Sequence, residues 1–406
     1  MNSITRAQLS LMMFLEFFIW GAWYVTMGTY LATVLKADSL QIGAAYSAMA
    51  VASIISPFFI GMIADRFFAA QRLLGVLHLI GAALLYFLTT INDPDTFYWV
   101  LLLYSLSYAP TLSLSSSVAF RQMNDGGNQF AGIRVWGTLG WIAIGQLIDK
   151  VFHIAPENLA MTFQIAAVIS VFLGIFSFFL PHTPPTEKGK ETSFAQIMGA
   201  DSFVLFKDRS FLIFFISAVL IFIPLSFYYS QTNQFLTEVG MKNATSNMTL
   251  GQISEALFIL AIPFLINRIG IKKMIIVGMI AWVFRFILFG YGNGDSNLWM
   301  LFAGIILHGV CFDFFYVTGQ IYTDSKAGER IKASAQGMLT MATYGVGMWI
   351  GTLLSGVVAQ AYTIDGVRHW FEIWMIPAAI AAGVLLLFAL FFNEKKEIKV
   401  AADAFS

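Results

Sequence analysis

The chain has 406 residues, of which 58% are hydrophobic and 11% charged, and its formal net charge at pH 7 is zero. Soluble domains carry about 25% charged residues, so the composition excludes an ordinary soluble protein and predicts an integral membrane protein. Zero net charge gives no support for nucleic acid as a partner. The single cysteine, Cys311, excludes an intrachain disulfide and a multi-cysteine metal site, and we expect no metal and no cofactor.

Apolar runs long enough to cross a bilayer follow one another along the chain. A membrane helix needs about 20 mostly apolar residues, and we expect an all-α protein with twelve transmembrane helices. The first run is too long for the apolar region of a signal peptide and lacks an Ala-x-Ala cleavage site. The predicted helices are centred on residues 9–35, 42–64, 73–91, 98–119, 133–152, 161–180, 211–237, 251–267, 274–291, 298–322, 333–360 and 371–392.

A polar break divides these helices into two sets of six. We expect an N-terminal half over residues 1–180, a cytoplasmic linker over 181–210 and a C-terminal half with a short tail over 211–406. Lys and Arg concentrate in cytoplasmic loops, which places both termini in the cytoplasm. The outer side then retains four basic residues, Lys36, Lys150, Lys242 and Arg368. Many secondary transporters have this arrangement and bind their solute near the midplane.

Arg134, Thr138 and Trp141 lie at positions i, i+4 and i+7 of one predicted helix and therefore share a face. A cation, a hydroxyl and an aromatic ring directed into a helix bundle could hold a polar, ring-bearing solute. The alternative is an arginine neutralised by a buried acid, with the tryptophan as packing.

Gln252 and Glu255 share a helical face three residues apart. Their side chains could bind hydroxyls or the edge of a base, and the carboxylate could take up a proton because hydrocarbon penalises a charge. The alternative is a capping box of Thr249 with Gln252 at a late helix start, which would leave Glu255 near the surface.

Asp313 lies inside an apolar run, one residue after Phe312 and five after His308. It could pair with Arg134 or another cation, or carry protons. The spacing of His308 and Asp313 also occurs in some acyltransferases, but positions five apart point about 140° away from each other on a helix, which argues against that chemistry.

Other intramembrane polar and aromatic residues complete the set of candidates. Glu16 is a candidate for the solute site or for proton transfer, and Arg285 is expected to be a structural partner. Tyr229, one turn from Ser226, could line a cavity or simply pack. His78 and His153 lie near predicted helix ends and are given no role.

Several strings in order resemble the nucleoside–proton symporters of the major facilitator superfamily over nearly the whole length. They are Ile133-Arg134-Val-Trp-Gly-Thr138, Gln252-Ile-Ser-Glu255-Ala-Leu-Phe-Ile-Leu, Gly270-Ile-Lys, Ala281-Trp-Val-Phe-Arg285-Phe, Phe312-Asp313-Phe-Phe and Ala333-Ser-Ala-Gln-Gly337-Met. The resemblance implies the superfamily fold and proton-driven nucleoside uptake. It also implies a nucleoside site lined by Arg134, Thr138, Gln252, Glu255 and Phe312, with Asp313 as the acid of the same helix.

The chain departs from the family pattern at several of these positions. Trp141 stands where the family has Phe, His308 where it has Tyr, and Ser226 and Tyr229 where it has two amides, while near Glu16 the family can carry Gln. The resemblance therefore supports membership of the family more strongly than it supports a particular substrate.

We accordingly expect a monomeric symporter of the inner membrane, and not an enzyme, that takes up a nucleoside together with a proton. The bound solute would contact Arg134, Thr138, Trp141, Ser226, Tyr229, Gln252, Glu255, His308 and Phe312, and the proton would use Glu255, Asp313 or Glu16. The alternatives are a symporter for a sugar or another polar metabolite, a membrane-embedded enzyme and a solute-sensing receptor. An enzyme would need a convergent nucleophile–base or metal set, and a receptor usually needs an appended signalling domain.

Overall fold

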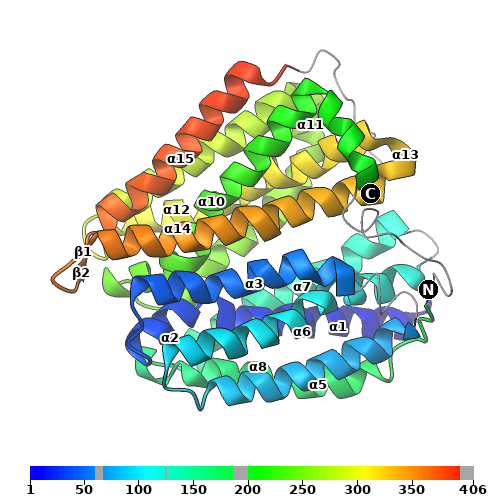
Figure 1. Cartoon of the computed structure of the whole chain (residues 1–406), viewed down its shortest axis with the longest axis horizontal. Coiled ribbons are helices and arrows are strands. Elements are labelled where there is room, and N and C mark those ends of the chain that lie inside the picture. Colours follow the sequence, from blue (N-terminus) through cyan, green and yellow to red (C-terminus); the bar gives the residue numbers. More distant parts are fainter. Residues whose placement is uncertain (60–66, 124–125, 186–199, 394–406) are drawn as a thin grey trace. The chain divides into compact units, whose positions relative to one another are not determined.

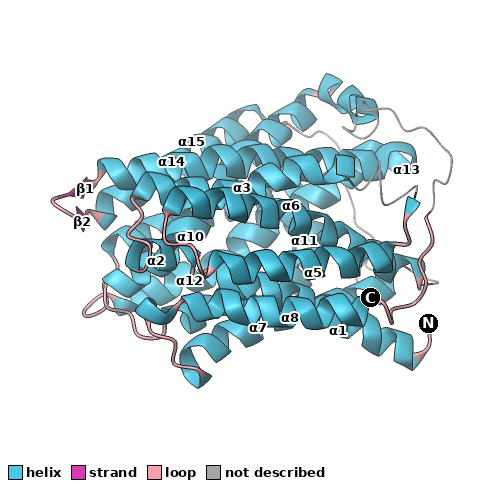
Figure 2. Ribbon diagram, turned by 60° about the horizontal axis from the view of Figure 1, so that its bottom comes forward, coloured by secondary structure: helices cyan, strands magenta, loops and turns pink. Residues whose placement is uncertain are grey.

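The computed structural model describes residues 1–59, 67–123, 126–185 and 200–393. The chain divides into two compact units, Met1–Phe194 and Ala195–Ser406. Nearly every element in the described ranges is a helix, and a single two-stranded hairpin accompanies them (Figure 2). The prediction of an all-α protein is confirmed for these residues.

The helices and strands have the following bounds. The first unit contains α1 (Ser3–Tyr24), α2 (Met27–Thr33), α3 (Ser39–Phe59), α5 (Ala70–Leu88), α6 (Pro94–Arg121), α7 (Gly126–Gln146), a π-helical turn (Leu147–Val151), a short 3-10 helix (Pro156–Asn158) and α8 (Ala160–Ser177). The second contains a 3-10 helix (Ala200–Lys207), α10 (Arg209–Glu238), α11 (Ala244–Tyr291), α12 (Leu298–Phe312), a π-helical turn (Asp313–Val317), α13 (Thr318–Thr340), a second π-helical turn (Met341–Gly347), α14 (Met348–Ala361), β1 (Thr363–Ile364), β2 (Val367–Arg368) and α15 (Trp370–Phe391).

Ten helical segments in the described ranges are long and apolar enough to cross a membrane. One of them is α10, whose 30 residues span about 45 Å at 1.5 Å per residue, more than the hydrocarbon core of a bilayer. Another is α11, with 48 residues, where Gly270 has φ 77° and ψ 163° and so interrupts the helical backbone. The chain is therefore a multi-pass membrane protein.

Several helix starts differ from the sequence-based prediction, and two of them have a clear local cause. The first helix begins at Ser3 because Asn2 caps it, accepting a hydrogen bond from the backbone amide of Thr5 at 2.7 Å. The helix predicted at 251–267 begins at Ala244, because the backbone turns at Asn243, which has a φ of 55°. In both cases the first turns of the helix contain polar residues, which a search for apolar runs does not include.

Small residues allow the helices of the first unit to approach closely. There α5 runs beside α8 (Figure 1) and α1 packs against α7. A side-chain carbon built on Gly75 of α5 would lie 2.8 Å from the carbonyl oxygen of Gly174 on α8. Such contacts hold membrane helices together because lipid offers no hydrophobic drive for their association.

Aromatic side chains fill the interior of the second unit, where α11 packs against α12 and α15, and α10 against α14 and α15. Trp374 of α15 lies at the centre, with ring-centroid distances of 5.3 Å to Phe235 and 5.2 Å to Phe289. Aromatic pairs of this kind contribute about 0.5–1.5 kcal/mol beyond the area they bury.

Asp208 caps α10 from outside the membrane-spanning segment. Its Oδ1 accepts from the backbone amides of Ser210 and Phe211, and its Oδ2 lies 2.8 Å from Nζ of Lys326. Partial burial acts to raise the pKa of this carboxyl, but the hydrogen bonds from Lys326 and the amides outweigh it and hold the pKa below its usual value.

Asp208→Ala is expected to lower the free energy of unfolding at neutral pH by about 0.5–2 kcal/mol, through loss of the cap. The folded-state pKa is depressed, so the stabilisation is present above the unfolded pKa of about 3.9 and is lost as pH falls through the folded pKa. Thermal unfolding of the purified protein should therefore separate the variant from the parent at pH 7, and the difference should shrink as the pH falls through the lowered folded-state pKa of Asp208. Asp295→Ala, in an exposed loop, is the control, and equal midpoints at pH 7 would contradict the prediction.

Candidate solute and proton sites

Arg134, Thr138 and Trp141 all lie on α7, partly exposed, and two of them contact α1. The guanidinium of Arg134 lies 4.0 Å from the ring centroid of Phe17, and the ring of Trp141 meets that of Trp20 edge to face at 5.5 Å. The stripe predicted from sequence therefore extends onto α1. Phe17 and Trp20, which sequence reasoning did not select, belong to the same half-buried face.

The backbones of α1 and α7 approach closely beside this stripe. A side-chain carbon on Gly140 would overlap the backbone of Phe14, and one on Gly137 would lie 2.7 Å from the ring of Phe17. These glycines bring α7 close enough to α1 for Arg134 to stack on Phe17.

Glu16 of α1 is fully buried and held by two neighbouring helices. Its Oε2 lies 2.9 Å from Nε2 of His78 on α5, and its Oε1 accepts a hydrogen bond from the hydroxyl of Thr111 on α6. The expectation that His78 has no role is wrong, because its imidazole contacts a buried carboxylate. The sequence does not show that α5 packs its buried face toward Glu16. Glu16, His78 and Thr111 are called the Glu16 cluster below.

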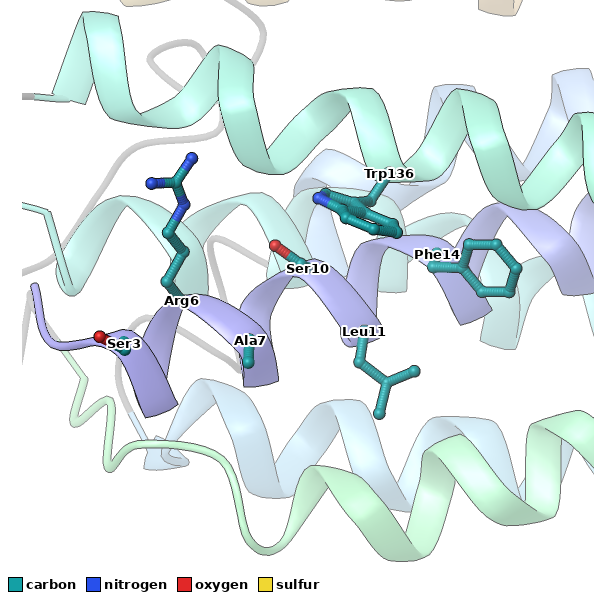
Figure 3. A pocket seen from close by; sticks show the side chains of 7 residues that line it. All are labelled: Ser3, Arg6, Ala7, Ser10, Leu11, Phe14 and Trp136. Atoms are coloured by element: carbon teal, nitrogen blue, oxygen red, sulfur yellow. The ribbon is translucent and has the colours of Figure 1, made fainter.

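A pocket of about 670 Å³ opens near the start of α1, lined by Ser3, Arg6, Ala7, Ser10, Leu11, Phe14 and Trp136 (Figure 3). Arg6 and Ser10 lie on the side of α1 that faces Trp136, whereas Leu11 points the other way. None of the residues predicted to bind solute or protons lines this pocket, so it is not assigned to the substrate.

In the second unit, α11 and α12 cross in close contact. The hydroxyl of Ser254 donates to the carbonyl oxygen of Ile306 at 2.5 Å and accepts from the amide of Gly309 at 3.2 Å. A side-chain carbon on Gly309 would lie 2.5 Å from Ser254, and one on Gly251 would lie 3.1 Å from Cβ of His308. This crossing places Glu255 and His308, the residues next to Ser254 and Gly309, side by side.

Glu255, His308 and Arg285 form a chain of polar groups, called the His308 cluster. Nε2 of His308 lies 3.8 Å from Oε2 of Glu255, and Nδ1 lies 2.9 Å from Nη1 of Arg285. His308 and Arg285 are fully buried, whereas the side chain of Glu255 is 29% exposed. Of the three side chains, that of Glu255 is therefore the one that is partly accessible from outside the cluster.

Aromatic rings surround the imidazole of His308. Tyr228 stacks on it at 4.9 Å, Tyr229 meets it edge to face at 6.3 Å, and Phe312 stacks at 5.9 Å. Tyr229 and Phe312 are half-buried and could present their rings to a solute. Ser226 lies apart, fully buried, with its hydroxyl donating to the carbonyl of Phe222 and packed against Met348 of α14.

The start of α11 rules out the capping-box interpretation of Thr249 and Gln252. Both residues lie inside the helix, and the hydroxyl of Thr249 donates to the carbonyl of Ser246. Gln252 is buried one turn before Glu255, on the same face. Glu255 therefore lies well within α11 and not at its surface end.

Asp313 opens the π-helical turn that follows α12 and is fully buried. Neither carboxyl oxygen has a hydrogen-bond partner among the described residues of its own unit. Such turns interrupt regular helices, frequently at functional sites. An unpaired buried carboxylate is costly, and protonation removes that cost, so Asp313 is suited to bind a proton.

Gly309→Ala is expected to cost about 1–3 kcal/mol of stability, because the added methyl group meets the backbone of α11 and cannot be relieved by a rotamer change. It should also weaken solute binding by moving His308 away from Glu255. Thermal unfolding and equilibrium binding measure the two effects. Gly383→Ala on α15 has open space around it and serves as the matched control, and an equally stable Gly309→Ala protein would contradict the close contact.

The chain is similar to known transporters along nearly its whole length. It matches the family described as "Nucleoside H+ symporter" over residues 3–397. The putative nucleoside transporter YegT of Escherichia coli (strain K12) is 42% identical, with 96% of this chain and 94% of the relative covered. The xanthosine permease of the same organism is 33% identical, with 96% and 97% covered. The crystal structure of the nucleoside transporter NupG has a TM-score of 0.87 at 33% identity, with 97% of this chain and 100% of that chain covered. The chain therefore belongs to the nucleoside H+ symporter family.

Proposed function

We propose that this protein takes up nucleosides together with protons across the inner membrane by alternating access. The observation that carries the proposal is the match to the symporter family along nearly the whole chain. The Glu16 and His308 clusters support it, because ionisable groups buried in apolar helices are costly and in membrane proteins mark solute and proton pathways.

The residues proposed to bind nucleoside are polar and aromatic side chains of α7, α10, α11 and α12. From α7, Arg134 and Thr138 would bind polar groups of the nucleoside, with Trp141 stacked on the base. From the second unit, Gln252, Glu255 and His308 would form hydrogen bonds, while Phe312 and Tyr229 supply ring surfaces. The contact of Ser226 with α14 suggests a supporting position for that residue, behind the solute-facing side chains. Buried donors and acceptors discriminate strongly, since a solute that lacks the matching group leaves them unpaired.

Three acids are proposed for proton coupling: Glu255, Asp313 and Glu16. Glu255 is partly exposed and adjoins the proposed nucleoside contacts, so protonation there can respond directly to binding. Asp313 is buried without a hydrogen-bond partner among the described residues of its unit, and Glu16 is bonded to His78 and Thr111. A change in protonation would shift the balance between two conformations only if one of them binds the proton more tightly.

The proposed architecture has twelve transmembrane helices in two six-helix halves, 1–180 and 211–406, joined by a linker over 181–210, of which 186–199 lie outside the described residues. Counting α11 as two helices that meet at Gly270, and adding the 21-residue α7, brings the ten apolar spans to twelve. The excess of Lys and Arg on one side supports a cytoplasmic location for both termini. We propose that the working unit is a monomer.

Uptake into proteoliposomes tests this function. Purified protein would be reconstituted and supplied with labelled uridine, adenosine or xanthosine, with and without an inward proton gradient. Accumulation that requires the gradient and collapses with a protonophore is expected. Intact vesicles that accumulate none of the three nucleosides would overturn the proposal, and labelled sugars would then test the alternative of a sugar symporter.

A further inference from the structure

Arg285 of α11 is a buried cation that contributes none of the proposed nucleoside or proton contacts. Its guanidinium carbon lies 3.5 Å from the ring centroid of Tyr228 and 5.4 Å from that of Trp282. Its Nη1 lies 2.9 Å from Nδ1 of His308. The guanidinium of Arg285 thus packs against aromatic rings, and one of its nitrogens is directed at the imidazole of His308.

The chemistry of the guanidinium decides which ring nitrogen of His308 carries the proton. A guanidinium has five N–H donors and no acceptor. Nδ1 of His308 must therefore accept the hydrogen bond from Arg285, which leaves that atom without a proton. The imidazole is then neutral, with its hydrogen on Nε2.

Nε2 of His308 points away from Arg285 and toward Glu255. The distance of 3.8 Å to Oε2 of Glu255 exceeds that of a direct hydrogen bond, and Nε2 has no hydrogen-bond partner among the described residues. A buried N–H without a partner is costly, so Nε2 is positioned to donate a hydrogen bond to a ligand or water atom beside the carboxylate of Glu255.

We propose that Arg285 is a positioning residue, which fixes His308 as an Nε2–H donor directed at the space beside Glu255. The solute, or a water that bridges to it, must present a hydrogen-bond acceptor to Nε2. His308 therefore contributes to solute specificity and does not carry the transported proton. The specificity part rests on the proposed function, whereas the assignment of the ring proton does not.

The tautomer can be measured directly by solid-state NMR on protein with ¹⁵N-labelled histidine in lipid bilayers. Comparison with His308→Gln identifies the His308 signals among those of the five histidines. Neutral His308 with its proton on Nε2 is expected in the parent protein. Arg285→Met should change this signature to a mixture of states, and Arg285→Lys should restore it, because an ammonium group also only donates.

Two substitutions of His308 test the donor without altering Arg285. The amide nitrogen of Gln reaches the place of Nε2, whereas the amide of Asn reaches that of Nδ1 and can accept from Arg285. Uridine binding is expected to persist within about threefold in His308→Gln and to weaken about tenfold in His308→Asn, which corresponds to about 1.4 kcal/mol for the lost hydrogen bond. These variants also keep the proposal testable if Arg285→Met does not fold. Arg268→Met, with an exposed arginine on the same helix, is the control.

Three results would overturn the proposal: a proton on Nδ1 of His308 in the parent protein, an imidazolium there, or an unchanged signature in Arg285→Met. Tighter uridine binding by His308→Asn than by His308→Gln would overturn the donor role. The NMR readout requires no transport, so failure of nucleoside uptake alone leaves the assignment of Arg285 standing and removes only the proposed function.

Discussion

Asp313→Asn is expected to abolish proton-driven accumulation of nucleoside while leaving nucleoside exchange across the membrane intact. Asn keeps nearly the shape of the buried carboxyl but is permanently neutral, so the protein can no longer distinguish the two sides of the membrane by their pH. With one coupled proton, a gradient of about one pH unit supports about tenfold accumulation. In the variant the ratio of internal to external nucleoside should fall to about 1, as measured with labelled uridine in proteoliposomes.

Exchange provides the internal control for this experiment. Counterflow of labelled uridine against unlabelled uridine needs a working site but no gradient, so it should match the parent protein. Asp324→Asn is the matched control, because that carboxylate pairs with Lys332 and is partly exposed. Gradient-driven accumulation that survives in Asp313→Asn would contradict a role of Asp313 in proton coupling. Glu255 or Glu16 would then be the candidates for proton coupling, and Glu255→Gln and Glu16→Gln are the variants that test them.

His78→Ala is expected to lower the free energy of unfolding by about 3–5 kcal/mol, because it leaves the carboxylate of Glu16 buried with a hydroxyl as its remaining side-chain partner. This pair joins α1 to α5, and Thr111 adds α6, so the loss would loosen three helices together. Thermal unfolding in detergent measures the effect.

A double variant separates loss of the pair from loss of volume. Glu16→Gln combined with His78→Ala removes the uncompensated charge, so the double variant should recover part of the stability lost in His78→Ala alone. His369→Ala, which truncates an exposed histidine, should change the stability by less than about 0.5 kcal/mol. A parent-like unfolding temperature for His78→Ala would show that the Glu16 cluster does not stabilise the unit.

The apolar runs of the sequence were sufficient to predict an all-helical membrane protein, because the hydrocarbon core fixes the length and composition of any segment that crosses it. Helix ends were predicted less well. The first turns of α11, from Ala244 to Leu250, contain polar residues and were left out, although they place Glu255 deep in the helix. Composition reports where a chain is apolar, whereas a helix begins where the backbone turns, here at Asn243.

The sequence by itself determined which groups are energetically costly to place in a membrane. Glu16, Arg285 and Asp313 each interrupt an apolar run, and a charge in hydrocarbon is unfavourable. It did not determine their partners. Glu16 meets His78 from 62 residues away, and Arg285 meets His308 from 23 residues away. These pairs depend on how helices cross and rotate, which is set by close contacts such as that of Gly309 with Ser254. Only the tertiary structure therefore decided that His78 has a partner and that His308 receives its hydrogen bond from an arginine.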